Sequence, residues 1–259
     1  MSAVSGISVR KRFPVVALGL GLVLAFLYAP LLPPIAHSFA GRAAGAGWFE
    51  HYRAIGDDPL LVAGIVNTLL IGLIVGVVTP LLALLIGRAI REWQRPRLIL
   101  GIVLLPLFVP GVSMGVATAL FFRLLGLEPS LLSMVIVQTL WALPFATLTV
   151  LTVMASFDEV HLEAAYLLGA DRLDAFLEIE LPHLLPGIVG AGLFSLILSL
   201  NETVRTSIVQ GGENTVQTYL WSQYQQVGLS PVLHALMTVL IMLTLTLVAG
   251  LAWLDRVRR

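Results

Sequence analysis

Long apolar stretches constrain this chain most, because six of them exceed the length that a helix needs to cross a lipid bilayer. The hydrocarbon core is about 30 Å thick, so about 20 mostly apolar helical residues span it. Strand-like alternation over about ten residues, the mark of an outer-membrane barrel, is absent. We predict an all-α, polytopic membrane protein with six transmembrane helices in one transmembrane domain over residues 1–259. The approximate spans are 14–36, 60–87, 98–122, 131–155, 185–209 and 231–254.

Composition supports this class and excludes several others. Of the 259 residues, 58% are hydrophobic and only 12% are charged, with 15 basic and 15 acidic side chains. A soluble domain carries about 25% charged residues, so this chain cannot supply a polar coat. A nucleic-acid binder would need clustered positive charge, and we expect no nucleic-acid partner. The absence of cysteine excludes disulfides, thiolate metal sites and cysteine nucleophiles, and we predict no metal site.

Basic residues beside the spans predict the orientation, because cytoplasmic loops carry an excess of Lys and Arg. Eleven of the 15 basic residues fall on one side, which we assign to the cytoplasm with both termini. These are Arg10, Lys11, Arg12, Arg88, Arg91, Arg95, Arg97, Arg172, Arg256, Arg258 and Arg259. The other side holds Arg42, Arg53, Arg123 and Arg205. The apolar run of the first span is longer than that of a signal peptide, so we expect it to be retained.

Prolines lie inside or beside several predicted spans. A proline leaves a backbone carbonyl of its helix without a hydrogen bond. Within a bilayer, such a group is tolerated only where protein or water in a cavity supplies a partner. Kinked packing helices would account for such prolines, but we favour a transporter whose broken helices surround a path. The residues are Pro30, Pro33, Pro34, Pro80, Pro106, Pro110, Pro144 and Pro186.

The longest cytoplasmic linker, 156–184, reads as two short helices outside the membrane. Ser156 and Glu159 predict a capping box at the start of the first helix. Gly169 can adopt the left-handed conformation that ends it. The linker holds seven of the chain's 15 acids. Anionic lipid attracts basic segments rather than acidic ones, so a protein partner is the better interpretation.

The second helix of this linker begins and ends at recognisable residues. Asp171 is expected to cap its start. Pro182 and Pro186 are expected to stop it before the fifth span.

The same linker resembles a known family. Its residues have the spacing of the EAA motif of ABC importer permeases, with seven specified positions: Glu163, Ala164, Ala165, Gly169, Ile179, Leu181 and Pro182. Asn67-Thr68-Leu69 resembles the start of the family's permease core, and residues 198–236 resemble the polyamine (spermidine/putrescine) branch. The resemblance extends through most of the chain.

This resemblance implies a type I (MetI-like) permease in the bacterial inner membrane. Glu163, Ala164, Ala165 and Gly169 would dock on a cytoplasmic ATPase, while Leu181 and Pro182 would fix the coupling helix against the fifth span. The implied partners are a second permease subunit in a heterodimer, two ATPase subunits that bind ATP and Mg, and a periplasmic binding protein. The linkers 41–59 and 210–230 are the expected contacts of the binding protein. The implied substrate is a polyamine or a related small polar solute.

The ATPase must be a separate subunit. A phosphate-binding P-loop needs a lysine that reaches the phosphates. Lys11 is the only lysine, and no glycine-rich loop precedes it. We therefore predict no enzymatic activity and no cofactor in this chain.

The fifth span carries the most costly side chains, since a charge near the centre of a transmembrane helix costs about 2.5–3.5 kcal/mol on insertion scales. One interpretation is a substrate path or gate, and the other is a structural Glu202–Arg205 pair. The polyamine branch commonly has an aspartate where this chain has Asn201, and Arg205 lies nearby. The candidate pathway residues are Ser195, Ser199, Asn201, Glu202, Arg205 and, on the fourth span, Trp141.

Two other classes of function are weighed against the permease. An ion-coupled secondary transporter would show inverted repeats and paired buried acids, and neither is visible. An intramembrane serine hydrolase would use Ser113, in a G-x-S-x-G pattern, with His234. That motif requires a strand-to-helix elbow. We instead interpret Gly111 and Gly115, like Gly72 and Gly76, as small-residue packing pairs.

Overall fold

The computed structural model describes residues 13–40 and 47–258, with side chains described for 17–40 and 47–246. The predicted cytoplasmic residues Arg10, Lys11, Arg12 and Arg259 therefore lie outside the described residues, as does Arg42 on the other side, with part of the linker 41–59. The described chain is helical, which confirms the predicted all-α class. It divides into two compact units, made of residues 1–58 with 223–259 and of residues 59–222.

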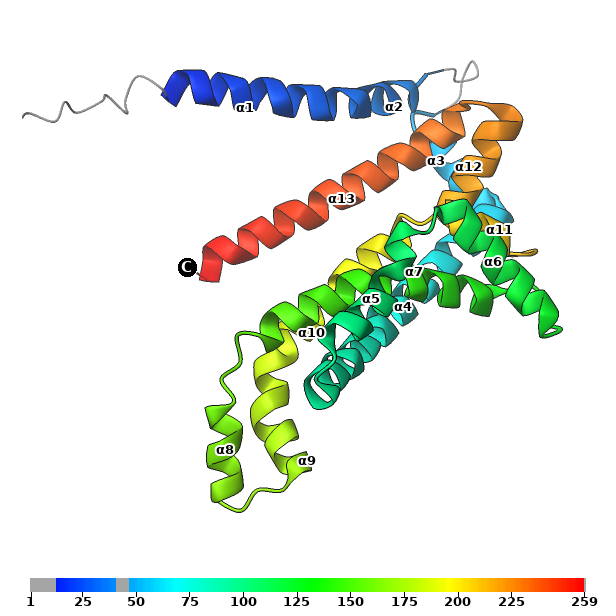
Figure 1. Cartoon of the computed structure of the whole chain (residues 1–259). Coiled ribbons are helices and arrows are strands. Elements are labelled where there is room, and N and C mark those ends of the chain that lie inside the picture. The colour runs from blue at the N-terminus through cyan, green and yellow to red at the C-terminus, as the bar shows by residue number, and fades with distance from the viewer. Residues whose placement is uncertain (1–12, 41–46, 259) are drawn as a thin grey trace, which may run out of the picture. The chain divides into compact units, whose positions relative to one another are not determined.

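The larger unit is built around three long helices. These are α4 (Pro59–Trp93), α7 (Leu131–Met154) and α10 (Leu181–Leu200), which pack against one another (Figure 1). The core between them contains Ile71, Val75 and Ala83 of α4 with Met134 and Val150 of α7. Around these helices lie α5 (Pro96–Phe108), α6 (Gly111–Leu124) and α11 (Val204–Val209), and α12 (Val216–Val227) begins in this unit.

Gly76 and Gly192 allow α4 and α10 to approach each other closely. A Cβ atom on Gly192 would lie 2.6 Å from the carbonyl oxygen of Gly76, and one on Gly72 would meet Leu200 and Ser199 at 3.5 and 3.8 Å. Gly111 and Gly115 likewise face Arg205 and Ile208 of α11. These contacts confirm both predicted small-residue packing pairs.

The smaller unit contains the N-terminal helices and the last helix. Its elements are α1 (Phe13–Tyr28), η2 (Ala29–Leu31), α2 (Leu32–His37), α3 (Glu50–Asp57) and α13 (Pro231–Arg258). The helix α13 packs against α2 and α3. Ser38 is buried beside them, where its Oγ donates to the Ile35 carbonyl and lies 2.8 Å from the Tyr52 hydroxyl.

Each predicted span falls on helices, but two of them are broken. Four helices are long and apolar enough to cross a membrane: 17–37, 59–93, 131–154 and 172–200. The third predicted span consists of α5 and α6, which meet at 105°. Val109 is extended there because it precedes Pro110, and proline disfavours helical backbone in the preceding residue. In the sixth span, the apolar part with described side chains is 231–246.

The fifth predicted span is also divided. The helix α10 ends at Leu200, residues 201–203 leave the helix, and α11 resumes at Val204. At its other end, α10 continues directly from α9 (Arg172–Ala175) and the π-helical turn η3 (Phe176–Glu180), so one helical run extends from Arg172 to Leu200. The prediction that Pro182 and Pro186 stop this helix is wrong. Pro182 lies at the start of α10, directly after the π-helical turn η3, and Pro186 lies inside α10, so neither proline ends the helical run.

Candidate functional site

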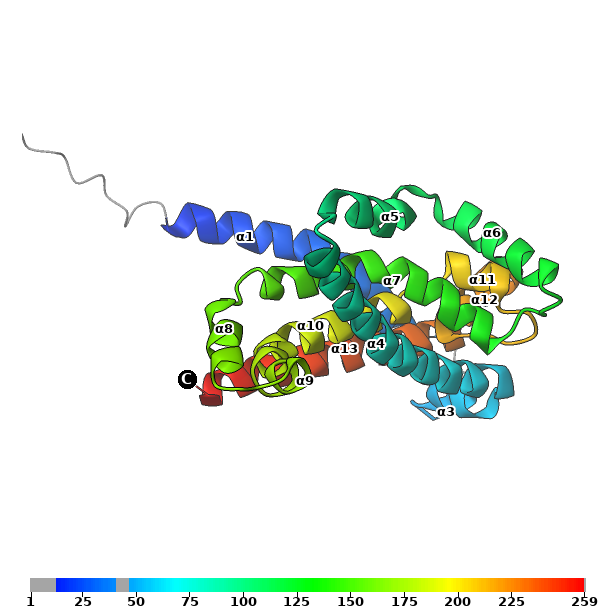
Figure 2. The same ribbon diagram turned by 60° about the horizontal axis from the view of Figure 1, so that its bottom comes forward.

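The linker 156–184 folds as a helix, a turn and a second helix. The first helix, α8 (Val160–Leu167), ends at Gly169, whose φ of +95° lies in the left-handed region that suits glycine. Asp171 then caps α9, because its Oδ1 accepts hydrogen bonds from the amides of Leu173 and Asp174 at 2.8 Å. Both features were predicted. The paired helices α8 and α9 form one end of the larger unit (Figure 2).

The predicted capping box at the start of α8 is wrong. Helix α7 extends as far as Met154, and Ser156 closes its end by donating to the Val153 carbonyl at 2.8 Å. The next helix consequently starts at Val160, with Glu159 at its N-cap position, and the Glu159 side chain makes no capping bond. The Asp158 Oδ1 accepts from the Val160 amide at 3.0 Å.

The seven motif positions fall into two groups. Glu163, Ala164 and Gly169 are exposed, whereas Ala165 is buried within the hairpin, which consists of α8, α9 and the turn between them. The second group lies in the helical run toward α10: Ile179 and Leu181 are half-buried and Pro182 is exposed. Leu181 packs against the core cluster that contains Leu184 and Val150. The structure thus joins an exposed first half of the motif to a second half anchored in the core.

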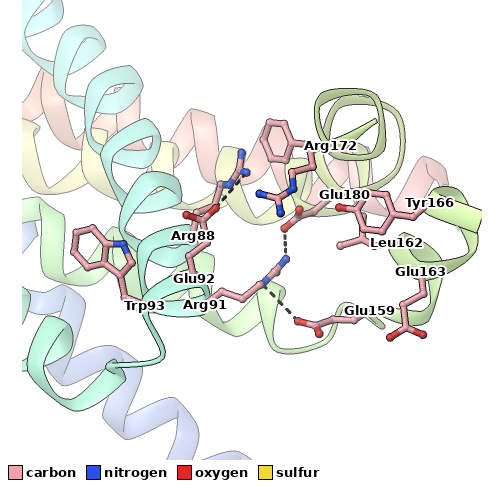
Figure 3. Close-up of a pocket in the computed structure, with 11 residues that line it drawn as sticks. Arg88, Arg91, Glu92, Trp93, Glu159, Leu162, Glu163, Tyr166, Arg172 and Glu180 are labelled. Carbon is pink, nitrogen blue, oxygen red and sulfur yellow. Dashed lines mark ion pairs between the residues drawn. The ribbon is translucent and has the colours of Figure 1, made fainter. Parts of the chain in front are cut away.

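An ion-pair cluster lies between the hairpin and the end of α4 (Figure 3). Arg91 Nη1 lies 2.8 Å from Glu180 Oε1, and Arg91 Nε lies 3.6 Å from Glu159 Oε1. The Arg88 guanidinium carbon lies 4.5 Å from the centroid of the Phe176 ring, within the range of a cation–π contact. These side chains line an open cleft of about 640 Å³.

Sequence reasoning missed this cluster. Arg88 and Arg91 entered only the count for orientation, and Glu180 only the count of acids. The available signal was the position of Glu180 between Ile179 and Leu181, directly before the apolar fifth span. Its side chain is only 6% exposed, and a buried carboxylate requires a partner.

The predicted pathway serines face the interior of this chain. Ser195 and Ser199 are buried, and Ser195 Oγ donates to the Ala191 carbonyl of its own helix. Ser199 Oγ donates to Gln138 of α7, and Gln138 Nε2 donates to Thr206 Oγ1 at 2.8 Å. These bonds tie α7, α10 and α11 together. The hydroxyl and amide groups of these side chains therefore form their hydrogen bonds within the larger unit.

Glu202 and Arg205 form the structural pair that was one of the two interpretations. Arg205 Nη1 donates to Glu202 Oε2 at 2.7 Å, and the Arg205 amide donates to Glu202 Oε1 at 2.8 Å. Trp141 covers the guanidinium, whose carbon lies 3.8 Å from the ring centroid. On another side lies Gly111, where a Cβ would approach the guanidinium carbon to 3.3 Å. Arg205 is 9% exposed, so the charge pair is enclosed by α6, α7 and its own segment.

Asn201 differs from its neighbours because it is exposed. Its Nδ2 donates to the Ile197 carbonyl at 2.8 Å. Of the six predicted pathway residues, the structure therefore buries Ser195, Ser199, Glu202 and Arg205, half-buries Trp141 and leaves Asn201 on the surface.

The segment 209–216 is fixed from two sides. Ser133 Oγ lies 2.7 Å from the Val209 carbonyl, to which it can donate. Asn67 Nδ2 donates to Glu213 Oε2 at 3.1 Å and to the Asn214 carbonyl at 2.9 Å. Thr68 Oγ1 accepts from the Val216 amide at 2.9 Å. The Asn67-Thr68 pair thus holds the connection between α11 and α12 against α4.

The G-x-S-x-G pattern lies in the first turns of α6 and so lacks the strand-to-helix elbow that a serine hydrolase uses. Among the described residues, no group of three or more His, Asp and Glu side chains is arranged to hold a metal ion.

Comparison with known proteins assigns the family. Residues 68–257 match the family described as binding-protein-dependent transport system inner membrane component. The spermidine/putrescine permease PotC of Haemophilus influenzae is 25% identical over 88% of this chain and 91% of its own length. The putrescine permease PotI of Escherichia coli is 26% identical over 95% and 91%. A solved bacterial ABC transporter involved in alginate import has the same fold, with 16% identity, a TM-score of 0.71, and coverage of 98% of this chain and 99% of the other.

The family match covers well over half of the sequence, and the membrane-length helices agree with it. The family consists of permease components of transporters, not of enzymes, and its members are multi-pass proteins of the inner membrane. The chain belongs to the binding-protein-dependent transport system inner membrane components, the permease subunits of ABC importers.

Proposed function

We propose that this chain forms half of the membrane path of an ABC importer for a polyamine or a related small polar solute. A second, non-identical permease subunit completes the path, and a periplasmic protein delivers the substrate. Two cytoplasmic ATPase subunits bind ATP and Mg. The substrate class rests on the two polyamine permeases, which match this chain over most of its length.

The observation that carries the coupling role is the exposed surface of α8. Leu167 and Leu168 are each 89% exposed at the end of this helix, outside the apolar spans. Neighbouring exposed apolar side chains outside lipid typically mark a protein-binding surface. Glu163 and Gly169 of the motif lie on the same short segment. The motif's exposed half would therefore contact the ATPase, while its anchored half passes the displacement to α10.

The charge distribution supports an orientation with this surface in the cytoplasm. Arg88, Arg91, Arg95, Arg97 and Arg172 all lie near the hairpin end of the larger unit or in the α4–α5 connection. Such residues concentrate on the cytoplasmic side. The segment 210–216 would then face the periplasm, where the binding protein docks.

An ion-coupled mechanism receives no support from the buried acids. The buried carboxylates among the described residues are Glu180 and Glu202, and each pairs with an arginine at 2.7–2.8 Å. A proton- or ion-coupled transporter needs a carboxylate that can bind and release its cation.

Copurification tests the coupling surface. The chain is expressed with its partner permease and ATPase, and the ATPase retained per permease is measured. Leu167→Ser with Leu168→Ser should lose most of the ATPase because the apolar contact is removed. Leu229→Ser is the matched control, since Leu229 is equally apolar and 61% exposed but lies in the predicted periplasmic linker. Equal ATPase retention by both variants would refute the docking surface.

Substrate class is tested on the cognate binding protein. Its thermal unfolding is measured with putrescine, spermidine, amino acids and phosphonates. A rise in Tm with polyamines alone is expected. A rise with another class and none with polyamines would reject the substrate while leaving the permease role intact.

A further inference from the structure

The cytoplasmic end of α4 extends well beyond the length that a membrane span requires. The helix has 35 residues, whereas about 20 suffice to cross the hydrocarbon core. Its last two turns carry Arg88 and Arg91 into the cleft between α4 and the coupling hairpin (Figure 3). The extension therefore brings two cations to the segment that is proposed to meet the ATPase.

Arg91 connects both ends of that segment to α4. Its Nη1 contacts Glu180, which lies at the end of the hairpin just before α10, and its Nε contacts Glu159, which lies directly before α8. The two acids are 21 residues apart in the sequence, yet one guanidinium reaches both. Since Arg88 also stacks on Phe176, α4 holds the hairpin at three points.

Glu180 is the stronger of the two contacts. Its side chain is 6% exposed and that of Glu159 is 67% exposed, so solvent screens the second pair much more than the first. Glu180 also lies in the π-helical turn η3, a wider helical turn that is frequent at functional positions. This turn joins the hairpin to α10, so the Arg91–Glu180 contact links α4 to the point where the hairpin meets α10.

We propose that Arg91 is a positioning residue that makes α4 move together with the coupling hairpin, so that ATP-driven displacement reaches α4 as well as α10. The inference rests on the proposed permease function. Arg91 touches neither substrate nor nucleotide in this scheme. Its loss should leave ATP hydrolysis in place and reduce the transport that each hydrolysis event drives.

The test uses the complete transporter in proteoliposomes, with its binding protein and the substrate found above. Uptake and ATP hydrolysis are measured together. We expect Arg91→Ala and Glu180→Gln to keep the ATPase bound and active but to lower uptake per ATP by about tenfold, a size typical of mutations that weaken coupling between sites. Arg95→Ala is the matched control, because Arg95 is exposed beside α4 and forms no ion pair among the described residues. It should retain the wild-type ratio.

Two further variants separate positioning from folding. The exchange Arg91→Glu with Glu180→Arg should restore part of the uptake per ATP that the single variants lose. Because the chain has no other cysteine, Arg91→Cys with Glu180→Cys can be joined within this chain by a flexible bis-maleimide, which adds one thiol across each of its two double bonds. Joining should raise uptake per ATP if the two segments move as one body. Uptake that falls on joining, or an unchanged ratio in Arg91→Ala, would overturn the proposal. Failure of the wild-type complex to couple hydrolysis to uptake would instead refute the proposed function.

Discussion

The hairpin formed by α8 and α9 differs in side-chain exposure from the polar cluster of Gln138, Ser199 and Thr206. In the hairpin, Leu167 and Leu168 stand exposed and have no apolar cover within the described chain. In the cluster, Gln138, Ser199 and Thr206 are buried and bond to one another. The described chain therefore leaves apolar side chains of the hairpin uncovered, and we propose that the ATPase covers them, whereas the hydrogen bonds of the cluster are formed within this chain. Exposure, rather than chemical type, separates the residues available to partners from those that hold the fold.

The largest effect on stability should come from the enclosed ion pair. Arg205→Ala leaves the buried Glu202 carboxylate without its cation, and breaking such a pair costs about 3–5 kcal/mol. We expect a marked fall in Tm for the protein in detergent. Replacing both residues by Met removes both charges and should recover most of that loss. A single variant as stable as the wild type would show that Glu202 and Arg205 are not paired.

A smaller effect is expected at the centre of the polar cluster. Gln138→Leu leaves the Ser199 and Thr206 hydroxyls without their shared partner, which costs about 1–3 kcal/mol for a buried polar group. Thr149→Val is the control, because Thr149 bonds only to the Phe145 carbonyl of its own helix. Thermal unfolding should separate the two variants. Equal Tm values would contradict the bridging role of Gln138.

Gly169→Ala should act on the hairpin rather than on the core. A left-handed conformation costs a residue with a Cβ about 1–2 kcal/mol, although this Cβ would meet no heavy atom within 4 Å beyond the neighbouring residues of the chain. We expect faster amide exchange in α8 and weaker ATPase retention. Gly190→Ala also meets open space but has helical backbone, so it should change neither measurement.

The double substitution in the exposed end of α8 should change the stability of the chain least, although it should weaken ATPase binding most. Leu167→Ser with Leu168→Ser alters exposed positions, whose substitution usually changes stability by less than about 0.5 kcal/mol. The Tm of the isolated chain should stay unchanged although the ATPase is lost. A large fall in Tm would mean that these leucines are packed within the subunit, and the contrast between the two regions would disappear.

The sequence was sufficient for features that depend on local chemistry. Apolar length predicted the spans, Gly169 predicted the turn, and Asp171 predicted the cap. The motif that suggested the family lies within one continuous segment. In contrast, the side chain of Arg205 is enclosed by Trp141 and Gly111, which come from other helices. The single sequence does not indicate which helices meet there.

The same limit applies to the predicted pathway face. The spacing of Ser195 and Ser199, four residues apart, places them on one side of a helix. It did not indicate whether that side met water or α7, because both environments satisfy hydroxyl groups. Glu180 was missed for a related reason, since its partner Arg91 lies in another helix.

The hydrogen bonds of Asn67 and Thr68 fix segment 209–216 to the first part of α4. The helix α4 is continuous from Pro59 to Trp93, with these bonds near its beginning and Arg91 near its end. At about 1.5 Å per residue, the helix is about 52 Å long. A shift imposed at one face of the bilayer would reach the other without crossing a loop. In the transporter that we propose, the binding protein and the ATPases would act on opposite ends of this one helix.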